Sequence, residues 1–237
     1  MTTAPTAQQT KDYLCTSPVQ HMDMLQVIER GTAEMISADK SGVLLYETRS
    51  GAHMLSAVDA DSARKMLRLV PSASLFTLHQ DFCLEDIQQR FGLQLVMTCR
   101  QAVWPRGSPL SLPPFSYPIR GLEKRHIGRV EEMYSHAVAA GYLAARIAEG
   151  EMVGAFHGER LIGFIGLHAE GAMGMLQVDP DYRRQAVGTN LIATLSNRLL
   201  KEGKIPFSQI EIANQPSLQI NQKLGFVLSS QLVYWME

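Results

Sequence analysis

The chain has 237 residues, enough for one large domain or two modest domains that each bury a hydrophobic core. Apolar residues make up 46% and charged residues 19% of the sequence, a balance that excludes a disordered or fibrous chain. The formal net charge is -1 and no long basic or acidic run is present, so we expect neither a nucleic-acid partner nor a membrane partner.

The N-terminal segment 1–14 is polar and lacks the apolar core of a signal peptide, and no later segment reaches the length of a membrane-spanning helix. We therefore expect a cytoplasmic protein with a loose N-terminus. Cys15, Cys83 and Cys99 form no C-x-x-C pair, and the seven histidines form no H-x-x-x-H or H-E-x-x-H pair. This pattern predicts reduced thiols and no metal site.

Residues 104–118 contain five prolines and a glycine, which neither a helix nor a central strand accommodates. We place the boundary between two domains here, so that residues 1–117 form the first domain with a proline-rich linker and residues 118–237 form the second. Periodicity in the first domain predicts helices at 18–29, 60–69 and 84–91 and strands at 34–38, 43–47, 53–57, 74–79 and 93–103.

In the second domain we expect one or two helices within 127–149, then strands at 152–157 and 161–168 joined by the turn Gly158-Glu159 as a β-hairpin. The pattern continues with strands at 173–178, 208–213 and 227–235 and helices at 189–202 and 217–224. The predicted fold class is α/β, with two domains that each contain a mixed sheet.

The segment 174–191 carries the clearest chemical pattern, because an apolar strand leads into a loop with Arg183 and Arg184 and then into a helix near Gly188. The first turn of a helix presents unpaired backbone N–H groups and a partial positive charge, which suit a pyrophosphate. The arginines can add charge-assisted hydrogen bonds. An ordinary strand-to-helix connection with two solvated arginines has the same local pattern, so this segment alone leaves both interpretations open.

The run 178–191 resembles motif A of the GNAT superfamily of N-acetyltransferases, V-x-P-x-[YFW]-[RQ]-x-x-G-x-[GA], and residues 214–226 resemble the strand-helix-strand element that follows it. The resemblance covers roughly residues 118–237 and implies a GNAT fold with acetyl-CoA, or another acyl-CoA, as co-substrate. The two-domain arrangement resembles glycine N-acyltransferase-like and FR47-like proteins. It implies a degenerate GNAT-like first domain that shapes the acceptor pocket or a dimer contact, so a homodimer is one expected assembly.

The same resemblance implies a set of cofactor contacts. The strand would pair with the pantetheine arm, the loop and helix start would bind the pyrophosphate, and three residues of the later element would lie beside the arm. In that order these residues are Leu176, Gln177 and Val178, then Arg183, Arg184, Gln185, Ala186, Val187, Gly188 and Thr189, then Asn214, Ser217 and Asn221. Ala186 stands where the family has a glycine and adds a methyl group where the backbone approaches phosphate. Asn214 and Ser217 also suit a local helix cap.

Asn221 departs from the family pattern, since many members have a tyrosine there that protonates the leaving thiolate, which an amide cannot do. His168 and Glu170, between the hairpin and the next strand, are the candidates for moving protons. We prefer Glu170 narrowly because a carboxylate also attracts a cationic amine, although both residues equally fit a polar hairpin end. Tyrosines that could replace the missing acid are Tyr142, Tyr182 and Tyr234.

Two functions remain open. The first is an N-acyltransferase in which a small-molecule or peptide amine attacks the bound thioester directly, without a protein nucleophile. The alternative is a catalytically inactive module that binds acyl-CoA or another protein, which Asn221 and the first domain's missing phosphate loop suggest. We favour the enzyme because an inactive site would be free to lose Arg183, Arg184 and Gly188, and all three are present. Residues 58–61 echo residues 178–181, which leaves a tandem duplication open.

Overall fold

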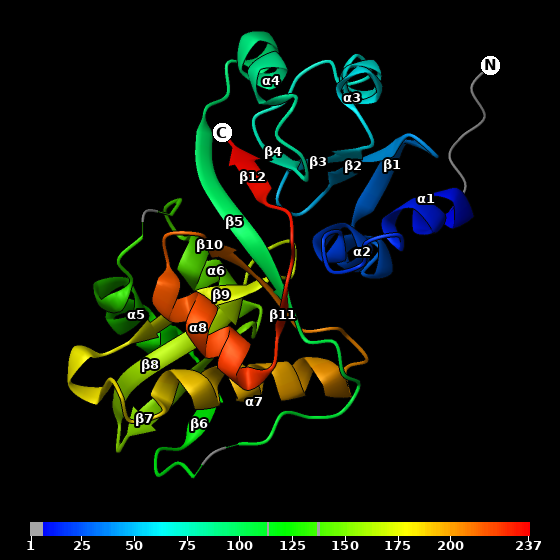
Figure 1. Cartoon of the computed structure of the whole chain (residues 1–237). Coiled ribbons are helices and arrows are strands. Elements are labelled where there is room, and N and C mark those ends of the chain that lie inside the picture. Colours follow the sequence, from blue (N-terminus) through cyan, green and yellow to red (C-terminus); the bar gives the residue numbers. More distant parts are fainter. Residues whose placement is uncertain (1–6, 113, 137) are drawn as a thin grey trace. The chain divides into compact units, whose positions relative to one another are not determined.

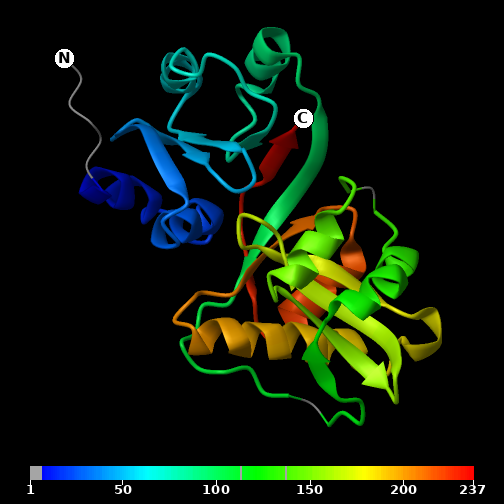
Figure 2. The same cartoon turned by 180° about the vertical axis from the view of Figure 1, so that it is seen from behind.

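The computed structural model describes residues 7–112, 114–136 and 138–237, which divide into two compact units (Figure 1 and Figure 2). The first unit combines residues up to 103 with 209–222 and 226–237, and the second combines 104–208 with 223–225. The compact units therefore differ from the division expected at residue 118, because the last strands of the chain join the sheet of the first unit. The division into domains at residue 118 stays a prediction.

The sheet of the first unit has the strand order β1-β2-β3-β4-β12-β5-β10, with β11 paired to β5. β3 and β4 run parallel, and β12 lies antiparallel between β4 and β5. Their bounds are β1 Ala33–Asp39, β2 Gly42–Glu47, β3 His53–Ala57, β4 Phe76–Leu78, β5 Leu95–Val103, β10 Phe207–Glu211, β11 Val227–Leu228 and β12 Val233–Met236. The sequence predicted one strand at 227–235, which is wrong: the chain turns after β11 and enters the middle of the sheet as β12.

Helices cover both faces of this sheet, because alternate strand residues point to opposite sides. Leu44 of β2 packs in one core with α3 (Ala60–Leu67) and α4 (Leu84–Phe91). Leu45, the next residue, packs in a second core with α1 (Ala7–Leu14) and α2 (Met22–Glu29). The start of the chain was expected to be loose, but α1 forms because Leu14 is fully buried in that second core. Residues 1–6 lie outside the described residues.

The second unit contains the antiparallel sheet β6-β7-β8-β9. Its elements are β6 Ile119–Gly121, η1 Lys124–His126, α5 Ile127–Met133, α6 Tyr142–Ala148, β7 Met152–His157, β8 Arg160–Leu167, β9 Met173–Val178, η2 Pro180–Tyr182 and α7 Val187–Lys201, whereas α8 (Gln215–Leu224) lies mostly in the first unit. The predicted β7–β8 hairpin is present, and β6 was not predicted. Val187 and Leu191 of α7 pack on β8 at Gly163, where a Cβ would lie 3.0 Å from Val187 Cγ1.

A buried carboxylate ties the elements of the first unit together. Asp23 Oδ1 accepts hydrogen bonds from His79 Nε2 at 2.9 Å, Gln101 Nε2 at 2.7 Å and the Met24 backbone N–H at 2.9 Å. Its Oδ2 accepts from Gln209 Nε2 on β10 at 2.9 Å. Burial alone would raise the pKa of Asp23, but the charge and hydrogen bond of His79 hold it below its ordinary value. Burial alone would lower the pKa of His79, but Asp23 raises it.

Replacing this carboxylate gives a pH-dependent loss of stability. Asp23→Asn should lower the free energy of unfolding by about 3–5 kcal/mol near pH 5, because His79 loses the counter-ion that allows it to stay charged while buried. The contribution of His79 is complete below its unfolded pKa of 6.5 and is lost as pH rises through its raised folded pKa. That of Asp23 is complete above 3.8 and is lost as pH falls through its lowered folded pKa.

Urea unfolding at pH 5 and pH 9 measures this effect, and the difference between Asp23→Asn and the unaltered protein should be smaller at pH 9. Asp61→Asn, which changes an exposed carboxylate, is the matched control and should stay within about 0.5 kcal/mol. An equal loss at both pH values would show that Asp23 acts by packing alone.

Candidate functional site

The strand β9 is the edge strand of its sheet, so one row of its backbone groups has no strand partner within that sheet. A register shift against β8 and a positive φ of 55° at Met175 mark a bulge in this strand. Leu176, Gln177 and Val178 follow the bulge and lie on this edge strand, where an extended group could pair with their backbone. Their expected contact with a pantetheine arm stays a prediction.

The loop that leaves β9 is fixed by Asp179, which is buried. Its Oδ2 accepts hydrogen bonds from Arg129 Nη2 at 2.8 Å and Arg160 Nη2 at 2.9 Å, and its Oδ1 accepts from the Asp181 N–H at 3.2 Å. Burial alone would raise the pKa of Asp179, but these donors hold it below its ordinary value. Sequence reasoning missed this residue, although the Val-Asp-x-Asp echo at residues 58–61 marked its position.

The loop ends in a helix start that no side chain caps. Ala186 is the N-cap of α7 with φ 60°, and the first intrahelical bond runs from the Asn190 N–H to the Ala186 carbonyl at 3.0 Å. The N–H groups of Val187, Gly188 and Thr189 precede that bond and have no partner within the helix. Gly188 is itself helical, so the left-handed positions are Ala186 and Arg184, whose φ is 61°.

Two arginines flank this helix start. Arg183 and Arg184 are both exposed, and the Arg183 Nε lies 3.5 Å from the Val178 carbonyl oxygen. Arg184 has no side-chain partner among the described residues. Gln185 donates from Nε2 to the Asp181 carbonyl at 3.0 Å. Unpaired N–H groups, the helix dipole and two cations together suit an anion with several phosphate oxygens.

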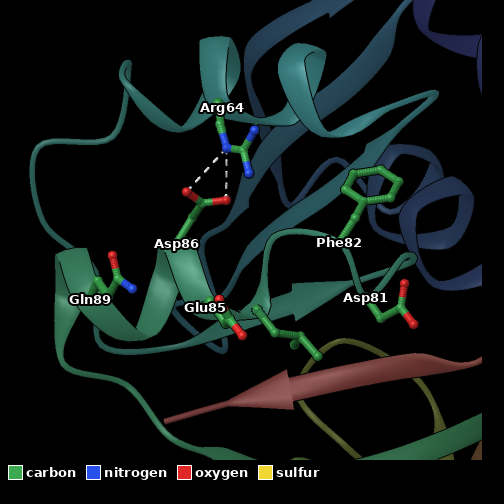
Figure 3. A pocket seen from close by; sticks show the side chains of 7 residues that line it. Arg64, Asp81, Phe82, Glu85, Asp86 and Gln89 are labelled. Carbon is green, nitrogen blue, oxygen red and sulfur yellow. Dashed lines mark hydrogen bonds and ion pairs between the residues drawn. The ribbon is translucent and has the colours of Figure 1, made fainter.

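The corresponding place in the first unit cannot hold an anion in the same way. There β3 leads directly into α3, and the Asp59 side chain caps that helix by accepting from the Ser62 N–H at 2.8 Å. A cavity of about 480 Å³ lies nearby, lined by Asp81, Phe82, Leu84, Glu85, Gln89 and the ion pair of Arg64 with Asp86 (Figure 3). Its carboxylates would repel phosphate, and its arginine is already paired.

The structure brings three of the proton-transfer candidates together. The Tyr142 hydroxyl lies 3.0 Å from His168 Nδ1, and the buried Glu170 carboxylate raises the pKa of Tyr142. Burial is the larger cause of that increase, which brings the pKa of Tyr142 to about 12. Burial and the charge of Arg146 lower the pKa of His168 to about 4. Tyr142 and His168 are therefore both neutral near pH 7.

The remaining predicted residues belong to other elements. Asn214 caps α8 by accepting from the Ser217 N–H at 3.2 Å, and buried Asn221 donates from Nδ2 to the Ser217 carbonyl at 2.9 Å. Tyr234 lies on β12, so these four residues all belong to the first unit. Tyr182 lies in the loop after β9, and its hydroxyl lies 2.8 Å from His157 Nδ1.

A cavity of about 300 Å³ lies beside Tyr142, between the end of α5 and the start of α6. Its wall includes Glu131, Tyr134 and His136 as well as Tyr142. Because Tyr142 also contacts His168, a molecule in this cavity would lie close to the groups that could exchange protons with it.

The position of His168 depends on a glycine. A Cβ on Gly174 would lie 2.3 Å from His168 Nε2, so the imidazole occupies the space that a side chain on β9 would fill. Gly174→Ala should displace the ring, break its contact with Tyr142 and cost about 1–3 kcal/mol of stability. Displacement toward water should also raise the pKa of His168 from about 4 toward 6.5.

Thermal unfolding and an NMR titration of the His168 imidazole measure both effects. Gly107→Ala, where no atom lies within 4 Å of the added Cβ, is the control. If Gly174→Ala leaves the melting temperature and the imidazole pKa of the unaltered protein unchanged, the packing of His168 against β9 is wrong.

No helix in the described part of the chain combines the length and the apolar character that crossing a membrane requires. Within residues 7–112, 114–136 and 138–237, no group of three His, Cys, Asp or Glu side chains is arranged to hold a metal ion. That no metal takes part stays a prediction.

Comparison with known proteins gives a family match for part of the chain and a similar fold. Residues 152–236 match the family model of the FR47-like proteins. No curated protein matches the sequence. A protein from Drosophila has a similar structure, with a TM-score of 0.66 and 16% identity over 92% of this chain and 86% of that one.

Two bacterial structures are also similar. A GCN5-related N-acetyltransferase from Kribbella flavida has a TM-score of 0.57 and 11% identity over 93% of this chain and 95% of its own. A GCN5-related N-acetyltransferase-like protein from Streptococcus suis has a TM-score of 0.55 and 14% identity over 98% of both chains. Residues 152–236 thus match the FR47-like family within a fold that this chain shares with GCN5-related N-acetyltransferases, which confirms the resemblance stated from the sequence.

Proposed function

We propose that this protein is an N-acyltransferase that moves an acetyl or other small acyl group from coenzyme A to an amine. The observation that carries the proposal is the uncapped start of α7, where two exposed arginines adjoin three unpaired N–H groups. The pyrophosphate of coenzyme A is a polyanion that fits such a site. The bulged edge strand β9 supports binding of the pantetheine arm, since the amide groups of that arm can pair with the backbone of the strand.

The reaction proceeds by direct attack. The neutral amine nitrogen forms a bond to the thioester carbonyl carbon, the C–S bond breaks, the sulfur leaves as a thiolate, and the nitrogen loses one proton to solvent as the amide forms. A thiol has a pKa of about 8.5, so this thiolate needs no acid near neutral pH. The absence of a tyrosine at Asn221 is compatible with such a step. The amine instead needs a base, because an alkylammonium with a pKa of about 10 cannot attack.

Glu170 is the proposed base. It is buried beside Tyr142, in the middle of the β8–β9 connection, and a carboxylate there attracts an alkylammonium ion. His168 is the weaker candidate, because burial and the charge of Arg146 lower its pKa to about 4, and the neutral imidazole does not attract the cationic amine. The cavity beside Tyr142 is the proposed binding place for the amine, and Glu131 adds a carboxylate to its wall.

Binding of coenzyme A tests the cofactor assignment. Calorimetric titration should give one site per chain, because α3 is closed by Asp59 whereas α7 is open. Arg184→Ala should weaken binding by roughly ten- to a hundredfold, the effect of losing a charge-assisted hydrogen bond of about 1.5–3 kcal/mol. Arg125→Ala removes an exposed arginine at η1 and is the control. Two sites per chain, or full affinity in Arg184→Ala, would show that the assignment is wrong.

The pH dependence of acyl transfer tests the base. The rate should rise with pH through the neutral range as the amine loses its proton, and Glu170→Gln should lower the rate without changing the affinity for coenzyme A. The release of free thiol from acetyl-CoA with a panel of amines measures the rate. If Glu170→Gln and His168→Ala both keep the full rate and pH profile, neither residue is the base, and ordered water is the better candidate for accepting the proton of the amine. If no amine is acylated but coenzyme A binds, the inactive binding module is the better function.

A further inference from the structure

The loop 179–186 holds a strained backbone. Arg184 and Ala186 both have left-handed φ angles, near 60°, although neither is a glycine. Left-handed backbone is unfavourable for residues with a Cβ and persists only where surrounding contacts enforce it. Hydrogen bonds of the Asp179 and Gln185 side chains supply such contacts in this loop.

Two tyrosine hydroxyls connect this loop to neighbouring segments of the second unit. The Tyr117 hydroxyl donates to Gln185 Oε1 at 2.8 Å, directly between the two strained residues. The Tyr182 hydroxyl lies 2.8 Å from His157 Nδ1 in the β7–β8 hairpin. Tyr117 comes from the proline-rich segment that the sequence indicated only as a linker. Tyr182 comes from η2 within the loop.

The three rings also pack against one another. The Tyr117 and Tyr182 rings meet edge to face, with centroids 5.7 Å apart and an interplanar angle of 81°. The His157 ring lies 5.4 Å from Tyr117 and 5.7 Å from Tyr182. The Arg160 guanidinium, which also binds Asp179, lies 5.4 Å from the centroid of Tyr182. The aromatic cluster of Tyr117, His157 and Tyr182 thus joins the proline-rich segment and the hairpin turn to the loop.

We propose that Tyr117 and Tyr182 are positioning residues that hold the loop 179–186 in its anion-binding conformation before the ligand arrives. The inference rests on the proposed function, since it concerns the affinity for coenzyme A. Apparent affinity falls in proportion to the fraction of molecules with a competent loop. Contacts that keep this fraction high strengthen binding without touching the ligand.

Hydroxyl deletion tests this role. Tyr117→Phe and Tyr182→Phe keep the rings but each removes one hydrogen bond, and each should weaken coenzyme A binding by about two- to tenfold. Tyr13→Phe removes a hydroxyl that lies 3.1 Å from Ser56 in the first unit and should leave the affinity unchanged. All three variants should melt within about 4 °C of the unaltered protein, so that unfolding does not explain the loss.

A double-mutant cycle separates positioning from a general structural effect. Ala186→Gly removes the penalty for left-handed backbone, so a larger fraction of molecules should keep a competent loop without help from Tyr117. In the Ala186→Gly background, the loss caused by Tyr117→Phe should therefore shrink to less than twofold. An equal loss in both backgrounds, or no loss in either, contradicts the positioning role while leaving coenzyme A binding intact. If the unaltered protein does not bind coenzyme A, both the proposed function and this inference are wrong.

Discussion

The candidate site depends on the ion pairs that the buried carboxylate of Asp179 forms with two arginines. Two arginines from different parts of the second unit, Arg129 and Arg160, converge on one of its oxygens, while the other accepts the Asp181 N–H. This arrangement fixes the chain where β9 ends. The loop then reaches the start of α7 with left-handed backbone at Arg184 and Ala186, and no described side chain caps the N–H groups that begin this helix.

The two units use equivalent aspartates differently. In each unit an antiparallel run of three strands ends at an aspartate, Asp59 after β3 and Asp179 after β9. Asp59 caps α3 directly, whereas Asp179 binds two arginines and caps only the short η2, so that α7 begins later without a side-chain cap. A tandem duplication would account for this likeness, and it stays a prediction.

Local pattern made much of the fold predictable. The β7–β8 hairpin follows from two apolar runs around Gly158-Glu159, and α7 follows from its apolar stripe. The pairing of β12 between β4 and β5 was not predictable, because strand periodicity shows which residues are buried but not which distant strand they pair with. The same limit applies to Asp23, whose partners Gln101 and Gln209 are far away in the sequence.

The residues of the candidate site that belong to a sequence motif were predictable. The contacts between residues far apart in the sequence were not. Arg183, Arg184 and Gly188 stand out in the sequence, and so do His168 and Glu170 between two strands. The contact of Tyr142 with His168 joins α6 to the β8–β9 connection, and the space for that imidazole depends on Gly174. Gly188 was given the special backbone role, but the left-handed angle belongs to Ala186, because the helix begins two residues earlier than periodicity predicts.

The most direct test follows individual backbone amides by NMR while coenzyme A is added. The account predicts that the amide signals of Val187, Gly188 and Thr189 shift strongly and saturate at one equivalent, because these N–H groups donate to the pyrophosphate. Amides at the start of α3, which Asp59 caps, should not move. Saturable binding that leaves the α7 amides unchanged, or that shifts the α3 amides instead, would contradict the account.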